Sequence, residues 1–180
     1  MKKILDLETL LPHRAPMLLL SEVVDYDETF ASALIHITAD SPFFDAELGG
    51  VPSWVGMEYM AQTIGIWAGH QQLINNKPVQ AGFLLGCRSY DCNNAIFPSD
   101  CTLQLSARPV YLDDSGIGAF DCAISSENIN GSESIRATAQ IKAFRPEDPK
   151  AFVRPFSIEK NTGTSFFTPE QCRSAQLNFI

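Results

Sequence analysis

Residues 52–69 read PSWVGMEYMAQTIGIWAG, and this stretch decides the fold. From position 54 to position 69 it contains one charged side chain, Glu58, and little other polarity beyond Gln62 and Thr63. Apolar residues occupy nearly every angle around a helical axis, which predicts a helix that is buried on all sides. The stretch is too short and too interrupted to cross a membrane. We expect the helix to run to about residue 74, because NNKP at 75–78 then ends it.

Glu58 is a carboxylate in the middle of this apolar helix. An unpaired carboxylate in such a place is costly, so it either finds a partner or takes up a proton more readily, which is how proteins make a general acid. The structural alternative is an ion pair with an arginine, or exposure of this end of the helix to solvent. Gln62, at i+4, can hydrogen-bond to Glu58. Gly65 and Gly69 lie on the same face of the helix as Glu58 and Gln62. Small residues there allow either close packing or room for a ligand chain.

The composition limits the class of protein. A chain of 180 residues suits one domain with a real core. The net charge of −8 argues against a nucleic-acid-binding protein, which needs a basic face. Five cysteines at 87, 92, 101, 122 and 172 form an odd set without metal-like spacing, so we expect reduced thiols in a cytoplasmic protein. Asp6 and Glu8 interrupt the apolar N-terminus, which argues against a signal peptide, and we expect no membrane association.

Strands surround the central helix in the sequence. A short helix at 4–11 precedes strands at 17–26 and 30–40, and the later strands lie at 81–90, 101–112, 116–126 and 133–144, with a turn at 93–100. Pro109 predicts an edge, a bulge or the end of the regular pairing. His36 falls on the same face of its strand as Phe30 and Leu34, and we expect a half-exposed histidine rather than a ligand. An antiparallel sheet with one face covered by the helix makes an α+β domain.

The C-terminal part differs in composition. We expect the main domain to span 1–146 and an extension to span 147–180. Four prolines from 146 onward break up long elements, but five phenylalanines are too many for a free linker. A capping-box pattern at 168–171 predicts a short helix at about 169–177. We expect the extension to pack on the domain or on a neighbouring subunit.

Three motifs carry a resemblance to a known family. LLPHRAPMLLLSEVVDYDE at 10–28, PSWVGMEYMAQ at 52–62 and IFPSDCTLQL at 96–105 resemble the 3-hydroxyacyl-[acyl-carrier-protein] dehydratases of fatty-acid synthesis. The second is similar to their helix motif PGVLxxEAxAQ. The resemblance covers about residues 8 to 145, is greatest to the branch found with aryl-polyene pigment pathways, and implies the hot-dog fold, in which an antiparallel sheet wraps around one long central helix.

The resemblance also implies a chemistry. In the family a histidine removes the α-proton of a 3-hydroxyacyl thioester, and a carboxylic acid, here Glu58, assists the departure of the β-hydroxyl. Backbone N–H groups at the helix start polarise the thioester carbonyl, which makes Ser53 and Trp54 candidate substrate-binding residues together with Gln62. The family builds its site across a dimer. We therefore expect an acyl thioester on acyl carrier protein as substrate, a homodimer as the minimal unit, and no metal or redox cofactor.

Two departures from the family pattern stand out. The family histidine precedes the helix in a pattern like FFxGHFP, whereas this chain reads FFDAELGGVP at 43–52. Ser53 replaces the family glycine at the helix start, where it can cap the helix. His13, Glu47 and His70 remain as candidate bases, and we favour His13 as the catalytic partner of Glu58. Its alternative role is to brace its turn. His70 lies about 120° around the helix and about 18 Å along it from Glu58.

Three functions remain open at this point. The first is a dehydratase that converts 3-hydroxyacyl thioesters to 2-enoyl thioesters. The second is a catalytically impaired dehydratase-like subunit that binds acyl thioesters and pairs with an active homologue, which the missing loop histidine supports. The third is a thioesterase on the same fold, with Glu58 activating water.

Overall fold

The computed structural model describes residues 4–126 and 134–146. The described residues form two α-helices, a 3₁₀ turn and eight strands. In chain order these are α1 Leu7–Leu10, β1 Glu22–Tyr26, β2 Ala31–His36, β3 Gly50–Pro52, the 3₁₀ turn Ser53–Val55, α2 Gly56–Ile74, β4 Phe83–Cys92, β5 Ile96–Pro98, β6 Thr102–Leu112, β7 Ile117–Ser125 and β8 Arg136–Phe144.

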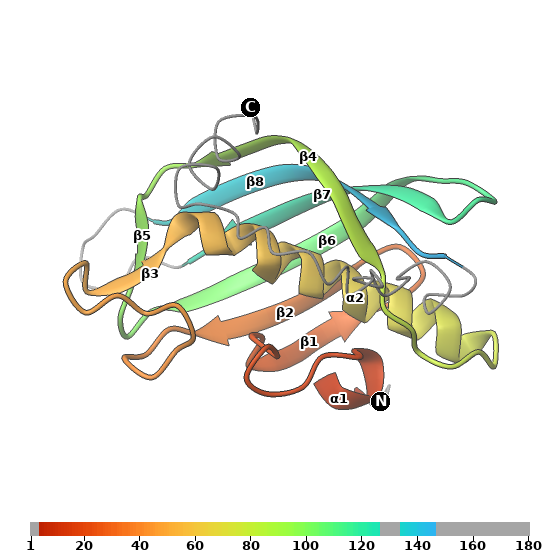
Figure 1. The fold of residues 1–180 in the computed structure, drawn as a ribbon, viewed down its shortest axis with the longest axis horizontal. Coiled ribbons are helices and arrows are strands. Elements are labelled where there is room, and N and C mark those ends of the chain that lie inside the picture. Colours follow the sequence, from red (N-terminus) through yellow and green to blue (C-terminus); the bar gives the residue numbers. More distant parts are fainter. Residues whose placement is uncertain (1–3, 127–133, 147–180) are drawn as a thin grey trace, which may run out of the picture.

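One antiparallel sheet carries most of the strands, in the order β1-β2-β6-β7-β8-β4. The helix α2 lies across one face of this sheet (Figure 1), where it packs against β2, β6 and β7. The strand β4 follows α2 directly in sequence and forms one edge, while β1 forms the other. This is the α+β hot-dog arrangement, and the predicted fold class is confirmed.

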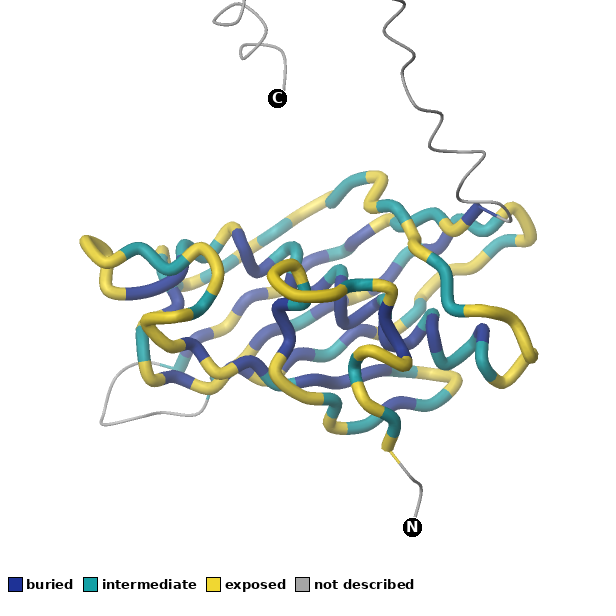
Figure 2. The backbone as a smooth tube through the Cα atoms, turned by 60° about the horizontal axis from the view of Figure 1, so that its bottom comes forward, coloured by how far each residue is buried: buried dark blue, intermediate teal, exposed yellow. Residues whose placement is uncertain are grey.

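The predicted central helix is confirmed, including its end at Ile74. Ten of its residues are buried, spread around the axis, as expected for an apolar helix packed on several sides. Figure 2 shows the buried positions running along this helix and the middle strands. The turn Ser53–Val55 precedes it, and Ser53 makes no side-chain capping bond, so the expected serine cap is wrong.

Alternation along the strands sets which side chains face the helix. In β8 every second residue is buried, namely Ala137, Ala139 and Ile141. Their neighbours Arg136, Thr138 and Lys142 are exposed on the other face. The register between β6 and β7 shifts at Pro109, which confirms the predicted bulge. The expected turn at 93–100 is wrong in part, because β5 within it pairs with β3. The first predicted strand is shorter than expected and begins at Glu22.

The short helix α1 rests directly on α2. A Cβ atom at Gly69 would overlap the backbone carbonyl oxygen of Leu10, and one at Gly65 would lie 2.6 Å from the Leu11 side chain. Close packing therefore explains Gly69, and the packing partner is α1 rather than the sheet. This contact fixes the turn that follows α1 against the side of α2.

The extension at 147–180, its predicted helix and the turn at 128–131 lie outside the described residues. Within the described residues, no helix is both long and apolar enough to cross a membrane. Along the edge strand β4, Leu84 and Leu85 are exposed.

Candidate functional site

Two predicted catalytic residues lie together at the N-terminal half of α2. His13 comes from the turn after α1, and Glu58 comes from the first turn of α2. The Nε2 atom of His13 lies 3.9 Å from Oε1 of Glu58, and the two side chains are 34% and 39% exposed. Glu58 is therefore not buried as expected, because its face of the helix opens into a cleft. The separation is longer than a hydrogen bond, although such contacts often tighten when a substrate binds.

Arg14 holds the turn that presents His13. Its guanidinium donates to the carbonyl oxygens of Leu11, His13 and Glu8, and its Nε lies 3.7 Å from the Glu8 carboxylate. The Nδ1 atom of His13 is buried and makes no hydrogen bond to any described residue. The Nε2 atom on the other side of the ring faces Glu58, while Arg14 braces the backbone. The sequence motif PHR pointed to this turn, but not to the bracing role of the arginine.

Gln62 holds Glu58 in place. Its Nε2 donates to Glu58 Oε1 at 3.0 Å and to the Met17 carbonyl at 2.8 Å, while its Oε1 accepts from the Leu19 N–H at 3.0 Å. The predicted i+4 contact is confirmed. Gln62 is fully buried, with 0% of its surface exposed, and is not among the cleft-lining residues, so the structure gives its predicted role in substrate binding no direct support. It is a positioning residue that ties the carboxylate to the segment after the His13 turn.

The start of the helix offers fewer donors than expected. The Ser53 N–H donates to the Ala95 carbonyl, and the Ser53 carbonyl accepts from the Gly56 N–H. The Ser53 N–H is therefore already used, which corrects its expected role in polarising a carbonyl. Helix geometry leaves the Trp54 N–H without an acceptor inside the helix. Trp54 and Glu58 are one turn apart on the same face, and the Trp54 indole is 65% exposed and meets Phe43 edge to face.

A cleft of about 480 Å³ runs along α2 from this pair. His13 and Glu58 line one end of it. Small or apolar residues, Ala61, Ile64, Gly65 and Ala68, line it along the helix, and Phe120 and Ile141 line it from the sheet. Beyond them the lining is mixed. The polar residues there are Gln71, Gln72, Asn75, Lys77, Gln80, Asp113 and Arg145, and apolar residues of the same stretches, Leu84, Leu112, Ile117 and Phe144, lie beside them. The glycine at 65 thus leaves room for a ligand chain as well as for α1.

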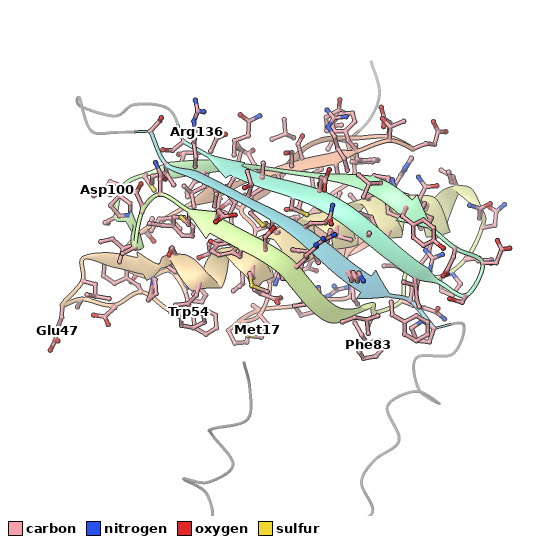
Figure 3. All side chains as sticks on the ribbon, turned by 90° about the horizontal axis from the view of Figure 1, so that it is seen from above. Met17, Glu47, Trp54, Phe83, Asp100 and Arg136 are labelled. Atoms are coloured by element: carbon pink, nitrogen blue, oxygen red, sulfur yellow. The ribbon has the colours of Figure 1, made fainter. Side chains whose placement is uncertain are left out.

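The other two candidate bases, His70 and Glu47, lie elsewhere, and so does His36, which was not a candidate. His70 packs against the ring of Tyr26, with 4.8 Å between ring centroids, and is not among the cleft-lining residues. Glu47 is exposed at the tip of its loop, where Figure 3 shows it pointing away from α2. His36 contacts Thr102 and Glu22 on the outer face of the sheet. Of the three candidates only His13 lies beside Glu58. Within the described ranges no three His, Cys, Asp or Glu side chains are grouped to hold a metal ion.

Comparison with known proteins identifies the family of this chain. The model of the ApeP-like family, described as ApeP dehydratase, matches residues 5–154. This chain belongs to the ApeP-like dehydratase family. It is also 30% identical over 120 residues to the 3-hydroxyacyl-[acyl-carrier-protein] dehydratase FabZ of Chlamydia trachomatis serovar L2, covering 64% of this chain and 77% of that protein. The FabZ of Cronobacter sakazakii is 41% identical over 63 residues, or 33% of this chain and 42% of its own length.

One solved structure supports the same assignment, and a second shares the fold. A chain of the dehydratase heterocomplex ApeI:P from Xenorhabdus doucetiae matches with a TM-score of 0.74 and 26% identity, covering 83% of this chain and 97% of that one. A hypothetical thioesterase with coenzyme A from Streptococcus pneumoniae matches with a TM-score of 0.51 and 12% identity, covering 71% of this chain and 88% of that one. The second likeness shows the fold alone. As a member of this family, the chain is placed among the lyase-type enzymes.

The buried amide of Gln62 yields a stability prediction. Gln62→Leu keeps the volume but leaves the buried Leu19 N–H without its acceptor, so the free energy of unfolding should fall by about 1–3 kcal/mol. Gln71→Leu is the control, because Gln71 Nε2 has no hydrogen-bond partner in the described residues. Its effect should stay within about 0.5 kcal/mol. Urea unfolding measures both, and equal losses would contradict the role of Gln62 as a structural link.

Proposed function

We propose that this protein is a dehydratase that converts 3-hydroxyacyl thioesters, carried on acyl carrier protein, to 2-enoyl thioesters. The observation that carries the proposal is the His13–Glu58 pair, 3.9 Å apart at one end of a long cleft. The family membership supports the reaction class. The apolar middle of the cleft supports an acyl chain as the substrate.

The pair can divide the reaction between its two members. His13 Nε2 takes the proton from Cα, the electrons of that bond form the Cα=Cβ double bond, and the β-hydroxyl leaves as water with a proton from Glu58. The Trp54 N–H, at the positive end of the helix dipole, would stabilise the charge that develops on the thioester oxygen. His13 then carries a proton and Glu58 has lost one. Their proximity allows the proton to return, directly or through a water molecule.

Substitution of each member tests this division. Glu58→Gln keeps the volume and a hydrogen-bonding oxygen but removes the proton donor, so dehydration should fall by about 10²–10⁴-fold. His13→Ala should be comparably damaging if His13 is the base. The measurement is the rate of 2-enoyl formation from a 3-hydroxyacyl thioester on acyl carrier protein, followed by mass spectrometry.

His36→Ala is the matched control, since this histidine lies on the outer face of the sheet, and its rate should match that of the wild type. A His13→Ala variant with nearly full activity would show that His13 only braces its turn. Release of free acid and thiol without any enoyl product would indicate the thioesterase instead. The thioesterase likeness at 12% identity gives that alternative no support beyond the fold.

The far end of the cleft indicates which kind of acyl group the cleft can hold. Glu58 and Gln71 are thirteen residues apart, which is about 20 Å along a helix, so an extended chain of this length reaches the polar lining. The Gln71 Nε2 there is buried and has no hydrogen-bond partner in the described residues. A terminal methyl group would leave this donor unsatisfied. We therefore propose an aryl polyene intermediate, whose aromatic end can meet the polar lining, as the substrate class.

A pair of substrates of equal length tests the far end. An acyl chain that ends in a hydroxyphenyl group should be dehydrated with a higher kcat/KM than one that ends in an alkyl group, by about tenfold or more, because a buried polar group left unpaired is costly. Gln71→Leu should reduce the difference. Equal kcat/KM values for the two substrates in the wild type would contradict this choice of substrate.

A second candidate function is that of a subunit in a larger dehydratase assembly. The absence of a histidine between positions 36 and 70 supports it, as does the likeness to a chain of the ApeI:P heterocomplex. The exposed leucines of the edge strand β4 supply a surface that another subunit could cover. On this view a partner would provide the base, and Glu58 would act across the interface. A homodimer remains our proposal for the chain alone.

Two measurements on the same preparation distinguish these assemblies. Sedimentation of the chain alone at micromolar concentration should give a dimer, and that dimer should dehydrate the substrate without a partner. A sedimenting monomer would contradict the homodimer. An inactive chain that gains activity only when mixed with a histidine-bearing homologous dehydratase would overturn the first proposal and establish the second.

A further inference from the structure

The start of the central helix is attached to the sheet at several points. The Ser53 N–H donates to the carbonyl of Ala95, the residue before β5, at 2.9 Å. On the other side, the hydroxyl of Tyr90 donates to the carbonyl of the same serine at 2.5 Å. Tyr90 lies on β4, 37 positions away in the sequence. One residue at the helix start is thus held both from β4 and from the residue that precedes β5.

The neighbouring Gly56 brings the helix start close to the sheet. A Cβ atom there would lie 2.5 Å from the Tyr90 hydroxyl, 3.0 Å from Ile124 and 3.1 Å from the ring of Phe97. Such distances leave no room for a side chain without a shift of the helix or of its neighbours. The hydroxyl of Tyr90 therefore fills the place that a larger residue at position 56 would occupy.

The Tyr90 phenol stays a hydrogen-bond donor under ordinary conditions. Burial, together with the nearby Cys92, raises its pKa well above the usual value. The hydroxyl thus donates to the Ser53 carbonyl at any pH at which the protein would work. Because the Tyr90 hydroxyl keeps its proton, its contact with Ser53 is the same throughout, and its effect is on the geometry of the helix start.

We propose that Tyr90 is a positioning residue for the reaction, because its hydroxyl fixes the turn that presents the Trp54 N–H to the thioester carbonyl. The inference rests on the proposed function, in which that N–H polarises the carbonyl. Trp54 follows Ser53 directly, so a shift of the Ser53 carbonyl rotates the peptide that carries the Trp54 N–H. A donor contributes strongly to catalysis only when it is held where the oxyanion forms, and small displacements are costly.

Tyr90→Phe removes the hydroxyl and keeps the ring. With the proposed substrate, kcat should fall by about tenfold or more while KM changes little, since the lost interaction belongs to the transition state. Tyr111→Phe is the matched control, because Tyr111 is exposed at the far end of β6 and should leave both constants unchanged.

A spectroscopic measurement separates positioning from a general structural effect. The probe is a saturated acyl thioester that lacks the 3-hydroxyl group and carries a ¹³C label in its carbonyl, so it binds without reacting. In the wild type its carbonyl stretch should move to lower frequency on binding, and in Tyr90→Phe most of that movement should be lost. Gly56→Ala, which crowds the hydroxyl from the helix side, should have the same effect.

The outcomes decide the inference whether or not the chain turns over substrate. The bound probe reports on the helix start even if the chain alone proves inactive, so failure of the proposed function is recognised separately. A carbonyl shift that is the same in Tyr90→Phe and the wild type would overturn the inference. The same holds if kcat falls only in step with a loss of folded protein, or if the wild type shows no shift at all.

Discussion

The buried amide of Gln62 is the interaction on which the site depends. It joins the carboxylate of Glu58 to the backbone of Met17 and Leu19, so one side chain links the central helix to the segment that follows the His13 turn. A buried amide with its partners in place specifies one arrangement, because each partner would be left unsatisfied by any shift. The contact of α1 with Gly69 supports the same turn from the other side. The two supports together set the separation of His13 and Glu58.

The features that follow from local pattern were predictable from the sequence. The apolar stretch at 52–69 predicted the helix, and the run at 133–144 predicted the strand β8, because both depend on the period of the side chains along the chain. The i+4 spacing also predicted the contact of Gln62 with Glu58. The motif PHR at 12–14 directed attention to His13. The resemblance supplied the fold and the reaction class, which no local pattern could give.

The features that depend on distant residues were not predictable. Glu58 is partly exposed because its face of α2 opens into the cleft, which depends on where the strands around it end. The Ser53 N–H donates to the Ala95 carbonyl, and the Ser53 carbonyl accepts from the Tyr90 hydroxyl. Each of these contacts joins residues about 40 positions apart in the sequence. The pairing of β3 with β5 joins two stretches that read as loop and turn. In each case the residue type can be read from the sequence, but the distant residue that contacts it cannot.

The central claim is that one chain brings both reacting groups to the same acyl thioester. A crystal structure with an unreactive 3-hydroxyacyl thioester analogue bound tests it most directly. We expect the α-carbon beside His13 Nε2, the β-oxygen within hydrogen-bond reach of Glu58, and the acyl chain over Ala61, Gly65 and Ala68. An analogue bound away from His13, or with its α-carbon facing a histidine of another subunit, would contradict the account.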